Sequence, residues 1–200
     1  MMEKQSQSVG IVVSVCVAFC LSGCMAPPKN AETEAANSAI DYKARVSALY
    51  EKGSWSEARN DLREWVALNP EAALDWARTI KDRANRITVT GQIAGLWAET
   101  APEKAAKFAV GIKDYDFRAM AIDQVARSWA KGDLDAAIAW NTGIKKPTDK
   151  AWAIFGVVFE LAKIDPVRAS QLAETIEVTG EETERIKKSA LKSIETNRLK

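Results

Sequence analysis

The sequence predicts an all-α protein, a right-handed α-solenoid of about ten antiparallel helices, on the basis of three observations. The stretch from Trp65 to Ile80 recurs downstream with an exact spacing of 32 residues and no insertions. Within each copy the apolar residues fall at helical spacing, and prolines or capping residues stand where the helices would begin. Self-similarity with a period of roughly 20 to 50 residues is typical of stacked units that bury their apolar faces against their neighbours.

Four positions define the repeat, and each has an equivalent in all four copies. These sets are Trp65, Trp97, Trp129 and Leu161; Pro70, Pro102, Leu134 and Pro166; Trp76, Phe108, Trp140 and Leu172; and Ile80, Ile112, Ile144 and Ile176.

Each copy contains a longer and a shorter helical pattern. In the longer one, Thr90, Ile93, Ala94 and Trp97 lie at i, i+3, i+4 and i+7, which places them on one helix face. The shorter one repeats this spacing from an alanine, and these alanines let neighbouring helices approach closely: Ala73, Ala105, Ala137 and Ala169.

The helix boundaries follow from local signals. The prolines of the repeat fit the first helical turn, where the missing N–H costs nothing, and Asp133 and Asp165 stand where N-caps belong. The predicted helices are 38–52, 55–68, 70–81, 84–100, 102–113, 115–131, 133–145, 148–164, 166–177 and 181–198. Because the connections are short, consecutive helices should be antiparallel.

Residues 1–23 have the pattern of an export signal. A short polar start leads into an apolar run from Val9 to Leu21, too short to span a bilayer of about 30 Å, and then into Leu21-Ser22-Gly23-Cys24. This sequence resembles the bacterial lipobox. The resemblance implies that Cys24 becomes the lipidated and acylated first residue of a membrane-anchored protein of the bacterial cell envelope. Met25 after the cysteine, by the same resemblance, favours the outer membrane facing the periplasm over the inner membrane.

Residues 24–37 contain two prolines among small and polar residues without an apolar period, and we interpret them as the lipidated N-terminus and a tether. Residues 38–200 form the predicted helical-repeat domain. The mature chain would have 200 minus 23, or 177, residues, enough for a substantial core.

Composition excludes several classes of function. All three cysteines precede residue 25, so no disulfide or thiolate site is expected in the mature chain. The chain has no histidine, and neither a phosphate-cradling glycine loop nor a G-x-S-x-G motif is present. A net charge of +1 gives no sign of nucleic-acid binding. We therefore expect no catalytic residues, no cofactor, no metal and no nucleic-acid partner.

Two stretches resemble the tetratricopeptide motif at its helix junction. They are Tyr50 to Ala58, closing with Asn69-Pro70, and Trp129 to Ala137. The period is 32 residues rather than about 34, so the resemblance is to a tetratricopeptide-like or HEAT-like repeat protein. It implies a scaffold that holds peptides or other proteins on a concave face.

A ladder of basic residues recurs one repeat apart at Arg86, Arg118 and Lys150. Asp82 and Asp114 precede the two arginines by four residues, so the ladder could consist of i, i+4 salt bridges, the interpretation we favour. Alternatively, the three side chains form a basic stripe for a carboxylate-bearing ligand or an acidic protein segment.

Trp152, Phe155 and Phe159 form an aromatic stripe displaced from the core positions of their repeat. We favour a central helix buried on nearly every side over an exposed groove for a partner. On the last helix Arg185, Lys188 and Lys192 share a face, which suits either a solvated cap for the stack or contact with anionic headgroups.

The leading prediction is a non-enzymatic, lipid-anchored scaffold that binds a protein or peptide partner through its helical-repeat surface. The alternative is a binding protein for a glycan or peptidoglycan fragment that uses exposed tryptophans and the ladder at Arg86. A carboxylate-dependent enzyme is the third possibility. Tryptophan exposure separates the first two, because a sugar site needs at least one or two indoles presented in a groove.

Overall fold

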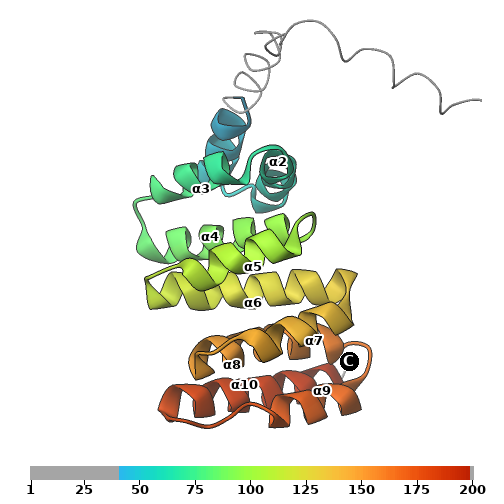
Figure 1. Ribbon diagram of the computed structural model, residues 1–200. Coiled ribbons are helices and arrows are strands. Elements are labelled where there is room, and N and C mark those ends of the chain that lie inside the picture. The colour runs from blue at the N-terminus through green and yellow to red at the C-terminus, as the bar shows by residue number, and fades with distance from the viewer. Residues whose placement is uncertain (1–40, 199–200) are drawn as a thin grey trace, which may run out of the picture. The chain divides into compact units, whose positions relative to one another are not determined.

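The computed structural model describes residues 41–198, and these are all-helical (Figure 1). No strand occurs within that range. The predicted export signal, Cys24 and the predicted tether lie outside the described residues.

The helices alternate between long and short. Residues 41–51 are helical, and the remaining elements are α2 (Trp55–Leu68), α3 (Pro70–Arg78), α4 (Arg83–Ala98), α5 (Pro102–Gly111), α6 (Tyr115–Gly132), α7 (Leu134–Gly143), α8 (Pro147–Leu161), α9 (Pro166–Glu174) and α10 (Glu181–Arg198).

The even-numbered helices form a continuous stack in which α2, α4, α6, α8 and α10 pack on one another in chain order (Figure 1). Each odd-numbered helix packs on the two even-numbered helices that flank it in sequence. The short helices α3, α5, α7 and α9 make no extensive contact with each other. Consequently, the surface of an even-numbered helix is left accessible between two successive short helices.

The predicted helix starts agree with the structure. Asp133 and Asp165 are N-caps, whose side chains accept hydrogen bonds from backbone N–H groups of α7 and α9. Pro70, Pro102 and Pro166 lie in first turns, as expected.

The short helices end two to three residues earlier than the periodicity predicts. Ile112 and Ile144 follow α5 and α7 in extended conformation. Their side chains therefore pack against the core from the connecting turns and not from the helices. Part of the reason is an arginine in the next helix, because Arg118 donates hydrogen bonds to the carbonyls of Ile112 and Lys113. These carbonyls are satisfied without another helical turn.

The core depends on small residues where helices cross. The predicted alanines Ala73, Ala105, Ala137 and Ala169 are all fully buried. Glycine allows the closest approach, since a Cβ added at Gly156 of α8 would lie 2.6 Å from the carbonyl oxygen of Asp123 and 2.7 Å from Cβ of Ala126 on α6. Gly91 of α4 faces Met120 of α6 in a similar way.

Among residues 41–198, no helix has the length and apolar content needed to cross a membrane.

Candidate functional site

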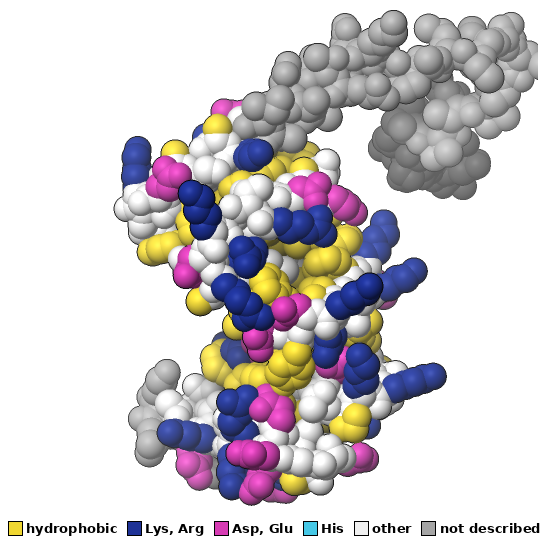
Figure 2. All heavy atoms as spheres, turned by 90° about the vertical axis from the view of Figure 1, so that its left-hand side faces the viewer, with side chains coloured by type: hydrophobic (Ala, Val, Ile, Leu, Met, Phe, Trp, Pro, Cys, Tyr) yellow, Lys and Arg dark blue, Asp and Glu magenta, His cyan; other side chains and the backbone are white. Residues whose placement is uncertain are grey.

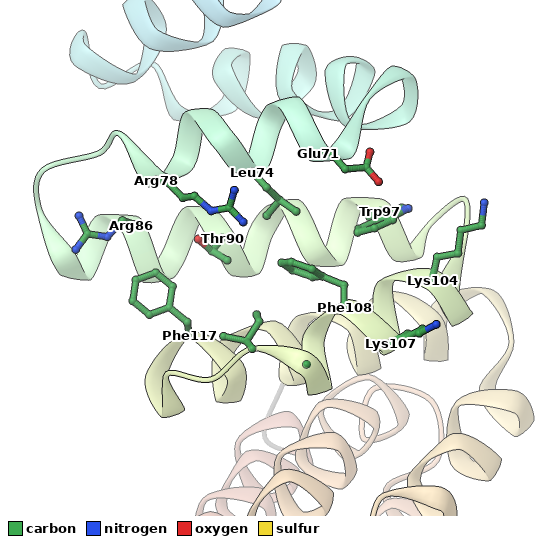
Figure 3. Close-up of a pocket in the computed structure, with 12 residues that line it drawn as sticks. Glu71, Leu74, Arg78, Arg86, Thr90, Trp97, Lys104, Lys107, Phe108 and Phe117 are labelled. Carbon is green, nitrogen blue, oxygen red and sulfur yellow. The ribbon is translucent and has the colours of Figure 1, made fainter.

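A groove of about 900 Å³ lies between α3 and α5, with α4 as its floor (Figure 3). We call it the α3–α5 groove. It is lined by the apolar residues Leu74, Trp97, Phe108, Ile112 and Phe117, by the charged residues Glu71, Arg78, Arg86, Lys104 and Lys107, and by Thr90 and Gly111. Its volume lies in the range typical of ligand sites.

The groove follows from the packing of the repeat. Because α3 and α5 both pack on α4 without extensive contact with each other, the side chains of α4 between them stay accessible. The rings of Trp97 and Phe108 pack with their centroids 5.7 Å apart and give the floor a fixed aromatic surface.

Each end of the groove carries a cationic side chain, and its centre is apolar. Arg86 and Phe117 lie at one end and Lys104 lies at the other, with Leu74 and Phe108 between them (Figure 3). Arg78 extends from α3 toward Leu74 and Thr90 (Figure 3) and also pairs with Asp75 on its own helix. With four cationic residues and one acidic residue, the lining has a net positive charge.

The turns from short to long helices lie on the left of Figure 1, and Figure 2 faces that side. Lys and Arg side chains project around the apolar surface along this side (Figure 2). Asp and Glu side chains lie among these cations, so the surface beyond the groove carries both charges with apolar surface between them (Figure 2).

Arg86 is held at its end of the groove by the backbone. Its Nη1 donates to the carbonyl of Ile80 at 2.5 Å and more weakly to that of Lys81 at 3.4 Å. Its Cζ lies 5.9 Å from the ring centroid of Phe117. Among the described residues, no carboxylate pairs with this guanidinium.

One repeat later, Arg118 occupies the same place in its helix but has a carboxylate partner. Its Nη1 donates to the carbonyls of Ile112 and Lys113, both at 2.8 Å, as Arg86 does to its own turn. Its Nε donates to both carboxylate oxygens of Asp149, at 3.0 and 3.1 Å, and the residues are 8% and 3% exposed. Phe117 is the repeat equivalent of Asp149, which explains why Arg86 lacks this partner.

The expected i, i+4 pairs do not form in the described part of the chain. Asp82 caps α4 by accepting from the N–H of Asn85 at 2.7 Å. Asp114 caps α6 and also pairs with Arg83 at 3.0 Å. An N-cap carboxylate turns toward the first-turn N–H groups, so it does not reach the side chain four residues later.

The ladder is therefore not a continuous basic stripe. Arg86 lines the α3–α5 groove, Arg118 is buried, and Lys150 is half-buried on α8. The corresponding space between α5 and α7 is smaller, at about 300 Å³, and Asp149 contributes to its lining. There, Ala136 and Ala139 replace the lysines of the α3–α5 groove.

The aromatic stripe on α8 is half-buried and is engaged by α6. Trp152 donates through Nε1 to the Tyr115 hydroxyl at 3.0 Å and meets Phe155 edge-on. The guanidinium carbon of Arg127 lies 3.7 Å from the ring centroid of Phe159 and 5.3 Å from that of Phe155. The structure agrees fully with neither prediction for this stripe, a helix buried on nearly every side or an exposed groove for a partner, because the three rings are half-buried.

The cations of α10 mostly have partners within the chain. Arg185 pairs with Glu182, and Lys188 pairs with Glu184 at 2.7 Å. Lys192 is exposed.

The tryptophans span the full range of exposure. Trp65 and Trp76 are buried, whereas Trp55 is 56% exposed. Trp97, Trp129, Trp140 and Trp152 are half-buried, and of these only Trp97 lines the α3–α5 groove.

Among residues 41–198, one carboxyl group has a raised pKa. Burial raises the pKa of Asp123 on α6, although Arg127 opposes the shift with a hydrogen bond of 2.9 Å. Asp123 does not line the α3–α5 groove. Within residues 41–198, no group of three or more acidic, histidine or cysteine side chains is arranged to hold a metal ion.

Sequence reasoning identified Arg86 but missed the rest of the groove. The repeat alignment carried a signal, because Lys104, Lys107 and Phe117 differ in character from their equivalents in the next copy, Ala136, Ala139 and Asp149. No family model, no curated protein and no solved structure matches the chain.

Proposed function

We propose that the protein is a non-enzymatic, lipid-anchored scaffold of the bacterial cell envelope that binds an apolar segment of a protein or peptide partner in the α3–α5 groove. The observation that carries this proposal is the groove itself, which combines an apolar floor with a cationic lining. Burial of apolar surface supplies about 25 cal/mol per Å², and the cations add selectivity and favour the approach of anionic partners.

The proposed framework is a right-handed α-solenoid built on the 32-residue repeat. In such a stack each unit is fixed by its neighbours, so the groove is formed before the partner arrives. A preformed site loses little conformational entropy on binding.

The proposed anchor is the acylated Cys24, with 24–37 as the tether. Thirteen residues between Cys24 and Ser38, at about 3.3 Å each, would let the groove reach roughly 40 Å from the membrane surface. Confinement to the surface would raise the effective concentration toward partners on the same membrane. We place the protein on the periplasmic face of the outer membrane.

A glycan or peptidoglycan fragment is the second candidate occupant. The half-buried Trp97 in the groove favours it, because indole rings pack against sugar faces, and Arg86 could bind an acidic group. The apolar side chains Leu74 and Phe108 at the centre of the groove fit a peptide better.

Site-specific photocrosslinking in intact cells tests the proposal. A photoreactive residue replaces the exposed Lys107 at the groove, and the matched control replaces the exposed Glu195 on α10. We expect a defined protein to crosslink to position 107 but not to position 195. The crosslink should be lost in the Cys24→Ala variant, which cannot be lipidated. If position 107 yields muropeptides and no protein, the glycan function replaces the proposed one.

A further inference from the structure

The equivalent arginine one repeat later indicates which chemical group Arg86 binds. Arg118, its equivalent one repeat later, donates to two backbone carbonyls with Nη1 and to the carboxylate of Asp149 with Nε. Arg86 makes the same kind of contacts with the backbone carbonyls, while Phe117 stands where Asp149 would be. The guanidinium of Arg86 is thus oriented as in the complete pair, without a carboxylate partner among the described residues.

The surroundings of the two arginines differ in accessibility. Arg118 is buried with its carboxylate, whereas Arg86 is half-buried and lines an open groove. A ligand can therefore reach Arg86, and the net positive charge of the groove lining favours a negatively charged one (Figure 3). Guanidinium groups bind carboxylates through short, charge-assisted hydrogen bonds.

Resting on the proposed function, we infer that the α3–α5 groove binds a short extended peptide segment whose carboxylate pairs with the guanidinium of Arg86 from the groove side, as the carboxylate of Asp149 pairs with Arg118 within the chain. The apolar side chains of the segment lie on Leu74, Trp97 and Phe108. The carboxylate is either a peptide C-terminus or an aspartate or glutamate side chain.

The length of the floor sets the length of the segment. From Arg86 to Trp97 is 97 minus 86, or 11, residues of α4, which corresponds to about 16 Å at a rise of about 1.5 Å per residue. An extended peptide advances about 3.3 Å per residue, so about five residues span this floor. Lys104 and Lys107 would then lie near the end of the segment remote from Arg86.

The experiment measures the binding of three fluorescent five-residue peptide mixtures to the full lipidated protein in detergent. The three central positions vary among Leu, Ile, Val, Phe, Met and Trp. The first mixture has a free C-terminal carboxylate and only neutral side chains. The second has an Asp as its last residue and an amidated C-terminus, so its carboxylate is the side chain. The third, neutral mixture has an Asn as its last residue and an amidated C-terminus. We expect at least one of the two carboxylate mixtures to bind about tenfold or more tightly than the neutral mixture, and the better of the two identifies the source of the carboxylate.

Three variants test the role of Arg86. Arg86→Gln should abolish the preference for carboxylate. Phe117→Asp supplies the chain with its own carboxylate for Arg86, so it should abolish the same preference by occupying the guanidinium. Phe117→Asn is the matched control, which removes the same ring without adding charge and should keep the preference. Thermal melts followed by circular dichroism verify that each variant folds.

Equal binding of all three mixtures, or an unchanged preference in both Arg86→Gln and Phe117→Asp, would overturn the inference while leaving the groove as a peptide site. If no mixture binds, the inference is also overturned. The crosslinking experiment at position 107 tests the proposed function independently: a crosslinked protein supports the scaffold function even when no peptide mixture binds.

Discussion

Arg118 and Asp149 form a buried ion pair between the first turns of α6 and α8, with Nε 3.0 Å from Oδ1. The same guanidinium also satisfies two carbonyls at the end of α5, so one side chain joins three helices. The arginine one repeat earlier retains the contact with the backbone and lacks the carboxylate. A structural ion pair in one repeat thus corresponds to an accessible cation in the previous one.

Replacement of Arg118 should therefore cost far more stability than replacement of Arg86. Arg118→Gln leaves the carboxylate of Asp149 buried without its countercharge, so we expect a loss of about 3–5 kcal/mol in the free energy of unfolding. Arg86→Gln removes hydrogen bonds to carbonyls at a half-buried site and should cost about 1 kcal/mol. Urea denaturation of both variants measures the difference, and equal losses would contradict the structural contrast between the two arginines.

The sequence was sufficient to predict the helices because their signals are local. Apolar spacing located every helix that begins within the described residues. Asp133 and Asp165 are N-caps, as predicted. The predicted ends of the four short helices and of α4 and α8 lie two to three residues beyond the observed ends. After α3 and α5 the chain is held by hydrogen bonds from Arg86 and Arg118 of the following helices, which no local signal reports.

The site was much less predictable because it depends on pairs that are distant in sequence. Asp114 stands four residues before Arg118, but it serves as an N-cap, and the actual partner is Asp149 from the next repeat. The groove likewise forms only when α3 and α5 both pack on α4 and leave its surface accessible between them. The spacing of residues along one helix does not reveal which side chains from three different helices lie together in the groove.

Asn141 on α7 offers a route to a more stable protein. Its side chain is 2% exposed, and neither its Nδ2 nor its Oδ1 has a hydrogen-bond partner among the described residues. The equivalent residues Ala77, Ala109 and Ala173 are fully buried, so the fold accepts alanine here. Asn141→Ala should raise the free energy of unfolding by about 1 kcal/mol, because it removes an unsatisfied buried amide from a helix interior.

Thermal and urea unfolding test this expectation, and the reverse exchange is the control. Ala109→Asn places an amide at the equivalent position of α5 and should cost about 1–3 kcal/mol. A loss of stability in Asn141→Ala would mean that the amide does have a partner in solution.

Gly156 determines how closely α8 approaches α6. An added methyl would meet the carbonyl oxygen of Asp123 and Cβ of Ala126, so Gly156→Ala should push the helices apart and cost about 1–3 kcal/mol. Gly143→Ala is the matched control, because no atom lies within 4 Å of its added Cβ, and it should change stability by less than about 0.5 kcal/mol. Similar effects of the two substitutions on urea unfolding would show that helical propensity, rather than close packing, governs both sites.

A chain of hydrogen bonds links α8, α6 and α10 and should make stability depend on pH. Trp152 donates to the hydroxyl of Tyr115 at 3.0 Å, and this hydroxyl donates to Oε1 of Glu182 at 2.6 Å. Tyr115 and then Arg185 hold the pKa of the Glu182 carboxyl below its ordinary value. Because the folded-state pKa is lowered, the stabilisation is present above the unfolded-state pKa of about 4.3 and is lost as the pH falls through the lowered folded-state value.

Tyr115→Phe removes the hydroxyl that lies between Trp152 and Glu182. We expect a loss of about 1–2 kcal/mol in the free energy of unfolding at pH 7, since one hydrogen bond to a charged group and one to an indole disappear. The difference from the wild type should hold down to about pH 5 and shrink below about pH 4, as Glu182 becomes protonated in both states. Urea unfolding between pH 3 and 7 measures this dependence, with Glu182→Gln as a control that should show a smaller fall in stability toward acid pH. A difference between Tyr115→Phe and the wild type that does not change with pH would show that the phenol acts through packing alone.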